Sequence, residues 1–253
     1  MRSRLPATVV LALCTATAAM GDVGQSRSRQ NLEFRGERRT YYLQEPSGRE
    51  PRPLVLLLHG TGGTGGELLA RWSALGQQHR LILAAPTSMD PVGWRVPRDG
   101  PDLLRAVIEA VGVRRPIDRH RVYLVGYSAG GDAALFASLA QSRYFAASAI
   151  LAAALRTRQY PLIDLAARRI PMVLIAAAGD STYPVAEVQG TRDALDARGF
   201  KVAYIELKGR DHGYVGGSQE VVGDAWAFLQ RHHLDGNPVY QPIDARTESF
   251  ALR

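Results

Sequence analysis

A serine lies in a segment that is typical of an enzyme nucleophile. Residues 126–130 are Gly-Tyr-Ser-Ala-Gly and fit the pattern G-x-S-x-G, with Ser128 in the centre. The apolar stretch 122–125 predicts a strand, and the alanine-rich stretch after Ser128 predicts a helix. A sharp turn between them raises the hydroxyl, and small neighbours are needed because bulky side chains would collide there. We therefore interpret Ser128 as the candidate nucleophile, with an ordinary turn serine as the alternative.

Such a serine needs a base that takes its proton, and His212 is the best placed histidine. It lies in residues 209–214, Gly-Arg-Asp-His-Gly-Tyr, which we expect to form a loop after the last predicted strand. That loop would lie at the carboxyl ends of the strands. Four other histidines are less suitable, because two end the last predicted helix and two precede predicted strands: His232, His233, His79 and His120.

The acid that orients the histidine should follow the predicted strand 172–177, and Asp180 occupies that position. The order serine, acid, histidine along the chain fits a triad on an α/β sheet. An isolated Gly-Asp pair is more often a turn or a helix cap. Asp211, beside the histidine, is the main rival for the role.

Backbone N–H groups next to the serine could stabilise an oxyanion. The stretch 59–63, His-Gly-Thr-Gly-Gly, follows the predicted strand 53–58, so we expect Thr61 to supply one donor and Ala129 the other. Four aromatic residues are expected in loops near the same end of the sheet, where each could line a substrate pocket or simply pack: Trp94, Tyr127, Tyr183 and Tyr214.

The same glycine-rich loop also suggests a different class of protein. Gly60, Gly62 and Gly65 fit G-x-G-x-x-G after a strand, a pattern that binds dinucleotides in oxidoreductases. That site also needs a carboxylate at the end of the second strand, but the stretch 81–85 is followed by Pro86, with no acidic residue before Asp90. The dinucleotide interpretation is therefore the weaker one.

The elements that must position these residues alternate along the chain. Apolar runs predict strands at 53–58, 81–85, 122–126, 148–152, 172–177 and 202–207, with an extra edge strand at 40–44. Helices are expected at 67–75, 102–111, 129–140, 186–197 and 219–232. This alternation predicts an α/β fold, with a mostly parallel central sheet and helices on both faces.

The two ends of the chain differ from the domain at residues 39–234. Residues 1–21 have arginines followed by an uncharged stretch and small residues, which predicts a signal peptide and a secreted or periplasmic protein without a stable membrane span. Residues 22–38 are expected to form a polar tether, and residues 235–253 a loose tail. The single cysteine, Cys14, lies in the signal, where a lipid anchor is the alternative.

The overall charge does not indicate a nucleic-acid partner. The 253 residues carry a formal charge of +7, but the basic residues are scattered and form no stripe with interleaved aromatic residues. The composition, 46% hydrophobic and 22% charged, suits one folded domain.

Several motifs together give the chain a family resemblance. They are Arg39-Thr40-Tyr41-Tyr42-Leu43, residues 53–60, residues 102–108, residues 119–124, residues 126–131 and residues 209–214. The chain resembles the secreted polyhydroxybutyrate depolymerase and feruloyl esterase group of the α/β-hydrolases. That resemblance implies hydrolysis of small-molecule or polymeric esters through an acyl-enzyme, without a metal or organic cofactor. A serine peptidase and a non-catalytic binding protein of the same fold are the alternatives, and the oligomeric state is left open.

Overall fold

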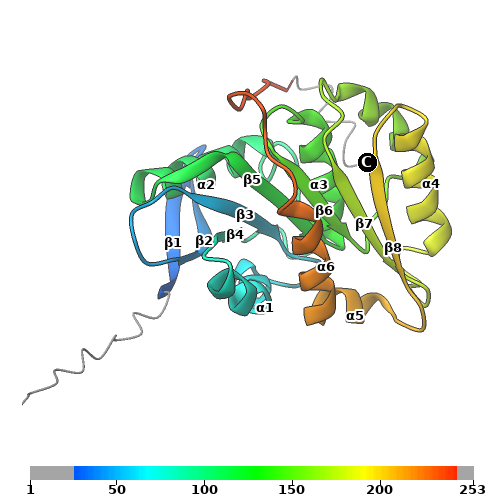
Figure 1. Cartoon of the computed structure of the whole chain (residues 1–253), viewed down its shortest axis with the longest axis horizontal. Helices are drawn as coiled ribbons and strands as arrows, with labels where there is room; N and C mark the ends of the chain where they lie inside the picture. Colours follow the sequence, from blue (N-terminus) through cyan, green and yellow to red (C-terminus); the bar gives the residue numbers. More distant parts are fainter. Residues whose placement is uncertain (1–25, 244–253) are drawn as a thin grey trace, which may run out of the picture.

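Eight strands form a single sheet in the computed structural model, which describes residues 26–243 (Figure 1). The strands are β1 (Ser26–Phe34), β2 (Glu37–Glu45), β3 (Arg52–Leu58), β4 (Ile82–Pro86), β5 (Ile117–Tyr127), β6 (Ala147–Leu151), β7 (Met172–Ala177) and β8 (Val202–Leu207). Their order across the sheet is β1-β2-β4-β3-β5-β6-β7-β8. The pairs β1–β2 and β2–β4 are antiparallel, whereas every other pair is parallel.

Helices cover both faces of this sheet, as the sequence predicts. One apolar layer contains residues of α2 (Pro101–Arg114), α3 (Ala129–Ala140), the 3-10 helix η1 (Thr157–Leu165) and α4 (Val185–Asp196). The opposite layer contains residues of α1 (Gly65–Gln78), α5 (His212–Gly217) and α6 (Gln219–Leu229). The predicted α/β fold is therefore confirmed.

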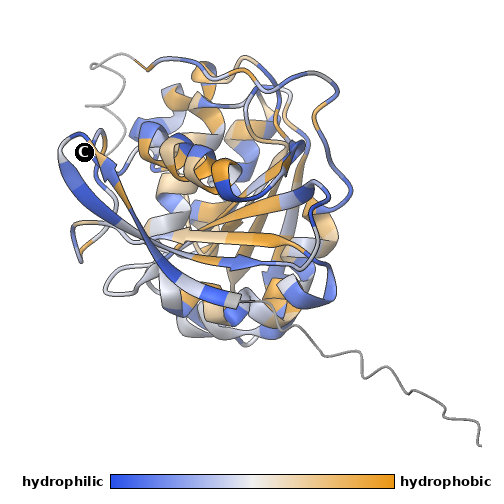
Figure 2. Ribbon diagram, turned by 90° about the vertical axis from the view of Figure 1, so that its left-hand side faces the viewer, coloured by the Kyte–Doolittle hydropathy of each residue, from blue (hydrophilic) through white to orange (hydrophobic). Residues whose placement is uncertain are grey.

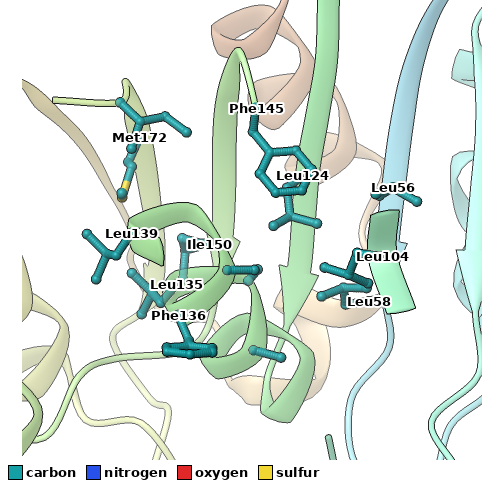
Figure 3. Close-up of a cluster of buried hydrophobic side chains, with 14 of the residues drawn as sticks. Leu56, Leu58, Leu104, Leu124, Leu135, Phe136, Leu139, Phe145, Ile150 and Met172 are labelled. Carbon is teal, nitrogen blue, oxygen red and sulfur yellow. The ribbon is translucent and has the colours of Figure 1, made fainter. Parts of the chain in front are cut away.

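The central strands are apolar on both faces because both are buried. Residues 54–58 of β3, for example, are all fully buried, and so are residues 173–175 of β7. Figure 3 shows side chains of α3, including Leu135, Phe136 and Leu139, beside Ile150 of β6 and Met172 of β7. This rigid double-sided core holds the ends of the strands in fixed positions.

The N-terminal part of the domain differs from the prediction. We expected residues 22–38 to be a tether and residues 40–44 an edge strand, but β1 pairs with β2 along its whole length and is itself the edge. Arg35 and Gly36 have φ values of 52° and 77°, and two such residues give the tight turn that suits a two-residue hairpin. β1 is polar because an edge strand is solvated (Figure 2).

The first part of the predicted loose tail is also attached to the domain. Gln141, at the end of α3, donates its side-chain amide to the Gln241 carbonyl and accepts the Gln241 N–H, at 2.6 and 2.9 Å. The Tyr240 ring contacts the Tyr144 ring at 5.7 Å. Residues 239–241 are therefore attached to the domain, because backbone groups of Val239 and Gln241 bond to Arg143 and Gln141, just after α3. The predicted signal peptide at residues 1–21 with Cys14, and the tail from residue 244, lie outside the described residues.

No helix in residues 26–243 has the length and hydrophobicity that crossing a bilayer requires. Nor does this part bring three or more histidine, cysteine, aspartate or glutamate side chains together as ligands for a metal ion.

Candidate active site

Ser128 lies at the sharp connection from β5 to α3. Its φ of 54° and ψ of −126° are uncommon for a residue with a side chain. The strained backbone is held by hydrogen bonds on both sides, because Ser128 N–H donates to the Leu151 carbonyl at 2.9 Å and its own carbonyl accepts from Gly131 at 2.7 Å. The turn thus presents the hydroxyl at the carboxyl end of the sheet.

The glycines of the motif are explained by close backbone contacts. A Cβ atom at Gly130 would lie 2.1 Å from the Leu58 carbonyl oxygen, and a Cβ atom at Gly126 would lie 2.1 Å from the Gly130 carbonyl oxygen. Both distances are far shorter than any real contact. The turn therefore requires glycine at both positions, as we expected from the pattern G-x-S-x-G.

The structure brings Ser128, His212 and Asp180 together in one hydrogen-bonded chain. His212 Nε2 lies 2.9 Å from Ser128 Oγ, and His212 Nδ1 lies 2.7 Å from Asp180 Oδ2. Ser128 and Asp180 are buried, whereas 23% of the His212 side chain is exposed. In this arrangement Nδ1–H donates to the carboxylate, which leaves the Nε2 lone pair free to accept the serine proton.

Asp180 is itself held by the loop that carries it. Its second oxygen, Oδ1, accepts the backbone N–H groups of Thr182 and Tyr183 at 2.8 and 2.9 Å. The carboxylate is therefore oriented at both oxygens. Its rival Asp211 has another task, because its Oδ1 accepts the Tyr214 N–H at 2.8 Å and caps α5.

The residues that follow Asp211 form a helix where we expected a loop. We expected residues 209–214 to form a loop, yet α5 begins at His212. The capping carboxylate and the buried Val215 stabilise this short helix against the sheet. His212 therefore projects from the first residue of a helix.

The two predicted oxyanion donors belong to the residue that follows Ser128 and to the loop after β3. A Cβ atom at Gly60 would be 3.1 Å from the Ser128 Cβ atom, so the loop after β3 lies against the nucleophile. Within residues 26–243, neither the Thr61 N–H nor the Ala129 N–H has a hydrogen-bond acceptor. Two free donors next to a serine hydroxyl are what an oxyanion hole requires.

Two of the predicted pocket residues flank the imidazole of His212. The Tyr183 ring is stacked on it, with centroids 5.9 Å apart, and the Tyr127 ring lies at 5.1 Å. Tyr127 also donates its hydroxyl to the His212 carbonyl at 3.0 Å. Both tyrosines thus restrict the movement of the histidine.

The other two predicted pocket residues have different surroundings. Trp94 is only 5% exposed, and its indole N–H donates to the His59 carbonyl at 2.9 Å, so it has little surface left for a substrate. Tyr214 donates its hydroxyl to Glu220 at 2.6 Å and lies under the Arg210 guanidinium. Trp94 therefore supports the loop after β3, and Tyr214 belongs to the outer side of α5.

Sequence reasoning missed two charged or titratable neighbours of the triad. Asp132 accepts the Tyr183 hydroxyl at 2.6 Å, and burial raises the pKa of Asp132 to about 6 in spite of that hydrogen bond. Burial likewise raises the pKa of the Tyr183 hydroxyl above its ordinary range. The available signal was the spacing, since position 132 is one helical turn after Ser128.

His59 is the second of these residues. Its Nε2 accepts the Ser88 N–H at 3.1 Å, and burial lowers the pKa of His59 below its ordinary value. A neutral ring fits these partners, because Nδ1–H then donates to the Gly60 carbonyl at 2.7 Å. His59 therefore shapes the loop after β3.

The cavities do not all lie at the triad. One of about 100 Å³ is lined by the loop after β3 together with Tyr127 and Arg71 of α1. Another, of about 310 Å³, lies beside the first turn of α4 and is lined by Arg156 and Tyr160. A third, of about 700 Å³, lies around Phe200 at the opposite ends of the strands, away from Ser128, His212 and Asp180.

Known structures share this fold. A thermostable esterase is 22% identical, with a TM-score of 0.63, over 82% of this chain and 63% of its own, so the chain spans less than two thirds of that esterase. The fluorophosphonate-binding serine hydrolase F of Staphylococcus aureus is 15% identical, with a TM-score of 0.68, over 81% of this chain and 98% of its own. A ferulic acid esterase is 15% identical, with a TM-score of 0.65, over 82% and 98%.

The sequence itself gives a family match. The curated proteins give no match to this sequence. The profile of the dienelactone hydrolase family, in contrast, matches residues 82–231, more than half of the chain. The matched span contains Ser128, Asp180 and His212, and it begins after the loop that carries Thr61. The chain belongs to the dienelactone hydrolase family.

Proposed function

We propose that this protein is a serine esterase that hydrolyses carboxylic esters through an acyl-enzyme. The observation that carries the proposal is the hydrogen-bonded chain from Ser128 through His212 to Asp180. The Thr61 and Ala129 N–H groups, which have no acceptor among residues 26–243, add to it. Nucleophile, base, orienting acid and oxyanion donors are the parts that acyl transfer needs.

The reaction proceeds in two steps. His212 Nε2 takes the Ser128 proton while Oγ attacks the ester carbonyl, and the Thr61 and Ala129 N–H groups stabilise the oxyanion. The imidazolium, which Asp180 stabilises, then gives its proton to the departing alcohol. Water enters, loses a proton to His212 and attacks the acyl carbonyl. The bond from the acyl carbon to Ser128 Oγ then breaks, His212 gives its proton to Oγ, and the acid leaves.

The same proposal covers the substrate class. Tyr127 and Tyr183 place aromatic surface beside His212, which suits short-chain or aromatic acyl groups such as feruloyl esters. The narrower resemblance to polyhydroxybutyrate depolymerases stays a prediction. Activity on an insoluble polyester, measured beside activity on soluble esters, tests it directly.

The test of the esterase proposal is turnover of p-nitrophenyl esters from acetate to octanoate, together with methyl ferulate. We expect Ser128→Ala to lower kcat by several orders of magnitude. Ser138→Ala is a matched control, because this serine lies in α3, the helix that follows Ser128, is fully buried and has an Oγ without a hydrogen-bond partner in the described part of the chain. A folded wild-type protein that hydrolyses none of these esters, or a fully active Ser128→Ala variant, contradicts the proposal. Turnover of peptide p-nitroanilides instead would favour a peptidase.

We also propose that the protein is exported. The proposal depends on the signal peptide predicted at residues 1–21. Mass spectrometry of the protein from the culture medium or periplasm, with Cys14→Ser as a comparison, separates the outcomes. Loss of the N-terminal segment in both forms supports a cleaved signal, whereas a lipid that depends on Cys14 shows an anchor.

A further inference from the structure

The loop that carries Thr61 is held by a second segment, residues 88–99, which we call the clamp. We call residues 59–63 the oxyanion loop. Several hydrogen bonds join the two. Thr61 Oγ1–H donates to the Val92 carbonyl at 2.9 Å, and Gly62 N–H donates to the Pro91 carbonyl at 2.8 Å. The Trp94 indole N–H donates to the His59 carbonyl at 2.9 Å, and Ser88 N–H donates to His59 Nε2 at 3.1 Å. The oxyanion loop is thus attached at its first, third and fourth residues to a neighbour distant in sequence.

The clamp is itself fixed from within. Asp90 Oδ1 accepts the Val92 N–H at 2.9 Å. Asp99 accepts the N–H groups of Met89 and Arg95 with its two oxygens, at 3.3 and 3.1 Å. Because its ends and its turn are both held by carboxylates, the clamp can serve as a rigid support for the oxyanion loop.

Trp94 is the central contact between the two segments. It is nearly fully buried, and its ring lies 5.1 Å from the ring of His59. The chain has three tryptophans, and the buried indole nitrogens of Trp72 and Trp226 have no hydrogen-bond partner in residues 26–243. The bond from Trp94 to the oxyanion loop is therefore a specific feature of this position and not a general property of tryptophans in this fold.

We propose that Trp94 is a positioning residue that fixes the Thr61 N–H at the oxyanion hole through the His59 carbonyl. The proposal rests on the esterase function proposed above. An oxyanion hole works because its donors are already aimed at the developing charge before the reaction starts. Without the indole hydrogen bond, the His59 carbonyl loses its partner in the clamp, and the loop that ends at Thr61 is less well fixed.

The test replaces Trp94 by phenylalanine, which keeps an aromatic ring and removes the indole N–H. We expect kcat for p-nitrophenyl acetate to fall about 10-fold, somewhat less than the loss that follows removal of an oxyanion donor itself. KM and the pH dependence of kcat/KM should stay unchanged, because the Ser128–His212–Asp180 chain is untouched. A purely structural effect would instead lower the midpoint of thermal unfolding and the fraction of molecules with a functional active site. It would leave kcat per active site unchanged.

Trp226→Phe is the matched control. It makes the same change of side chain in the core, but it removes an N–H without a partner. We expect kcat per active site within twofold of the wild-type value. A second variant, Thr61→Val, removes the hydroxyl bond to Val92 and keeps the backbone N–H. It should lower kcat in the same way, and the double variant with Trp94→Phe should lose less than the product of the two effects.

Phosphonylation by a fluorophosphonate measures the same property without an ester substrate. Ser128 Oγ displaces fluoride from phosphorus, His212 takes the hydroxyl proton, and intact mass records the added group. We expect Trp94→Phe to react about 10-fold more slowly than the wild type and Trp226→Phe to react at the wild-type rate. Equal rates in Trp94→Phe and wild type, in both assays, overturn the clamp proposal alone. A wild-type protein that neither hydrolyses esters nor reacts with the phosphonate overturns the proposed function itself.

Discussion

Asp180 fixes which nitrogen of His212 carries the proton. With Nδ1–H bonded to Asp180, Nε2 faces Ser128 as an acceptor. An amide at position 180 could donate to Nδ1 and favour the tautomer that cannot accept the serine proton. We therefore expect Asp180→Asn to lower kcat by about 10⁴-fold with little change in KM, as measured on p-nitrophenyl esters.

The control for this variant is Asp211→Asn. Asparagine caps a helix about as well as aspartate, so α5 and His212 should stay in place. This control should keep kcat within a few fold of the wild-type value. If Asp211→Asn is the more damaging change, the assignment of the acid is wrong.

Asp132 should make stability depend on pH. Its pKa is raised from 3.8 to about 6 in the folded protein, mainly by burial. Between these values the folded state holds a proton that the unfolded state releases, so the contribution to stability is complete below about pH 4 and is lost as the pH rises through about 6. Asp132→Asn stays neutral and can still accept the Tyr183 hydroxyl.

Relative to wild type, Asp132→Asn should therefore gain stability between pH 4 and pH 7, by up to about 3 kcal/mol. Urea unfolding at pH 4, 5, 6 and 7 measures this difference. Parallel curves for the two proteins over that range would contradict the assignment of a raised pKa to Asp132.

The turn between β5 and α3 tolerates no side chain at Gly130. An added Cβ atom would lie 2.1 Å from the backbone of β3, which cannot move without disturbing the sheet. Gly130→Ala should lower the free energy of unfolding by about 3 kcal/mol or more and abolish esterase activity. Gly223→Ala is the control, because a Cβ atom on this residue of α6 meets nothing within 4 Å. It should be neutral or stabilise the protein by up to about 1 kcal/mol, as urea unfolding would show.

Among the elements, the apolar strands were predictable and the polar strand β1 was not. β7 has the predicted bounds, because a run of apolar residues buried on both faces indicates a strand of a parallel sheet. β8 also has the predicted bounds, although it is an edge strand and only partly buried, because most of its residues are apolar. β1 was missed because its stability comes from pairing with β2 and not from an apolar face. The helix α5 was missed because half of its six residues are glycine, a residue that disfavours helices when tertiary packing is ignored.

At the scale of the site, the types and order of residues were enough to predict that Ser128, His212 and Asp180 lie together. Sequence could not show that Trp94 is buried under the oxyanion loop, because its partner is a backbone carbonyl 35 residues away. The link between Tyr183 and Asp132 was hidden for the same reason, since the two side chains come from separate elements. Long-range contacts of this kind depend on how the loops pack, which no local pattern contains.

Across the whole molecule, a buried ion pair connects the N-terminal hairpin to the catalytic end. Arg39 of β2 pairs with Asp99 at the end of the clamp, and both side chains are almost fully buried. The Arg39 guanidinium also donates to the Arg98 carbonyl at 2.7 Å. The hairpin of β1 and β2 therefore helps to hold the clamp in place, although it carries none of the reacting groups.

Removal of one member of such a pair leaves a buried charge without a partner. We expect Arg39→Met to lower the free energy of unfolding by about 3 to 5 kcal/mol. Arg35→Met, in the turn of the same hairpin, is the control, because Arg35 pairs with Asp102 in an ion pair exposed by more than 40% on each side. Its loss should cost about 1 kcal/mol or less. Urea unfolding of both variants gives the comparison. Equal losses of unfolding free energy would contradict the larger contribution that we assign to the buried pair.

Because Asp99 also anchors the clamp, Arg39→Met should lower kcat per folded site as well, whereas Arg35→Met should leave it unchanged.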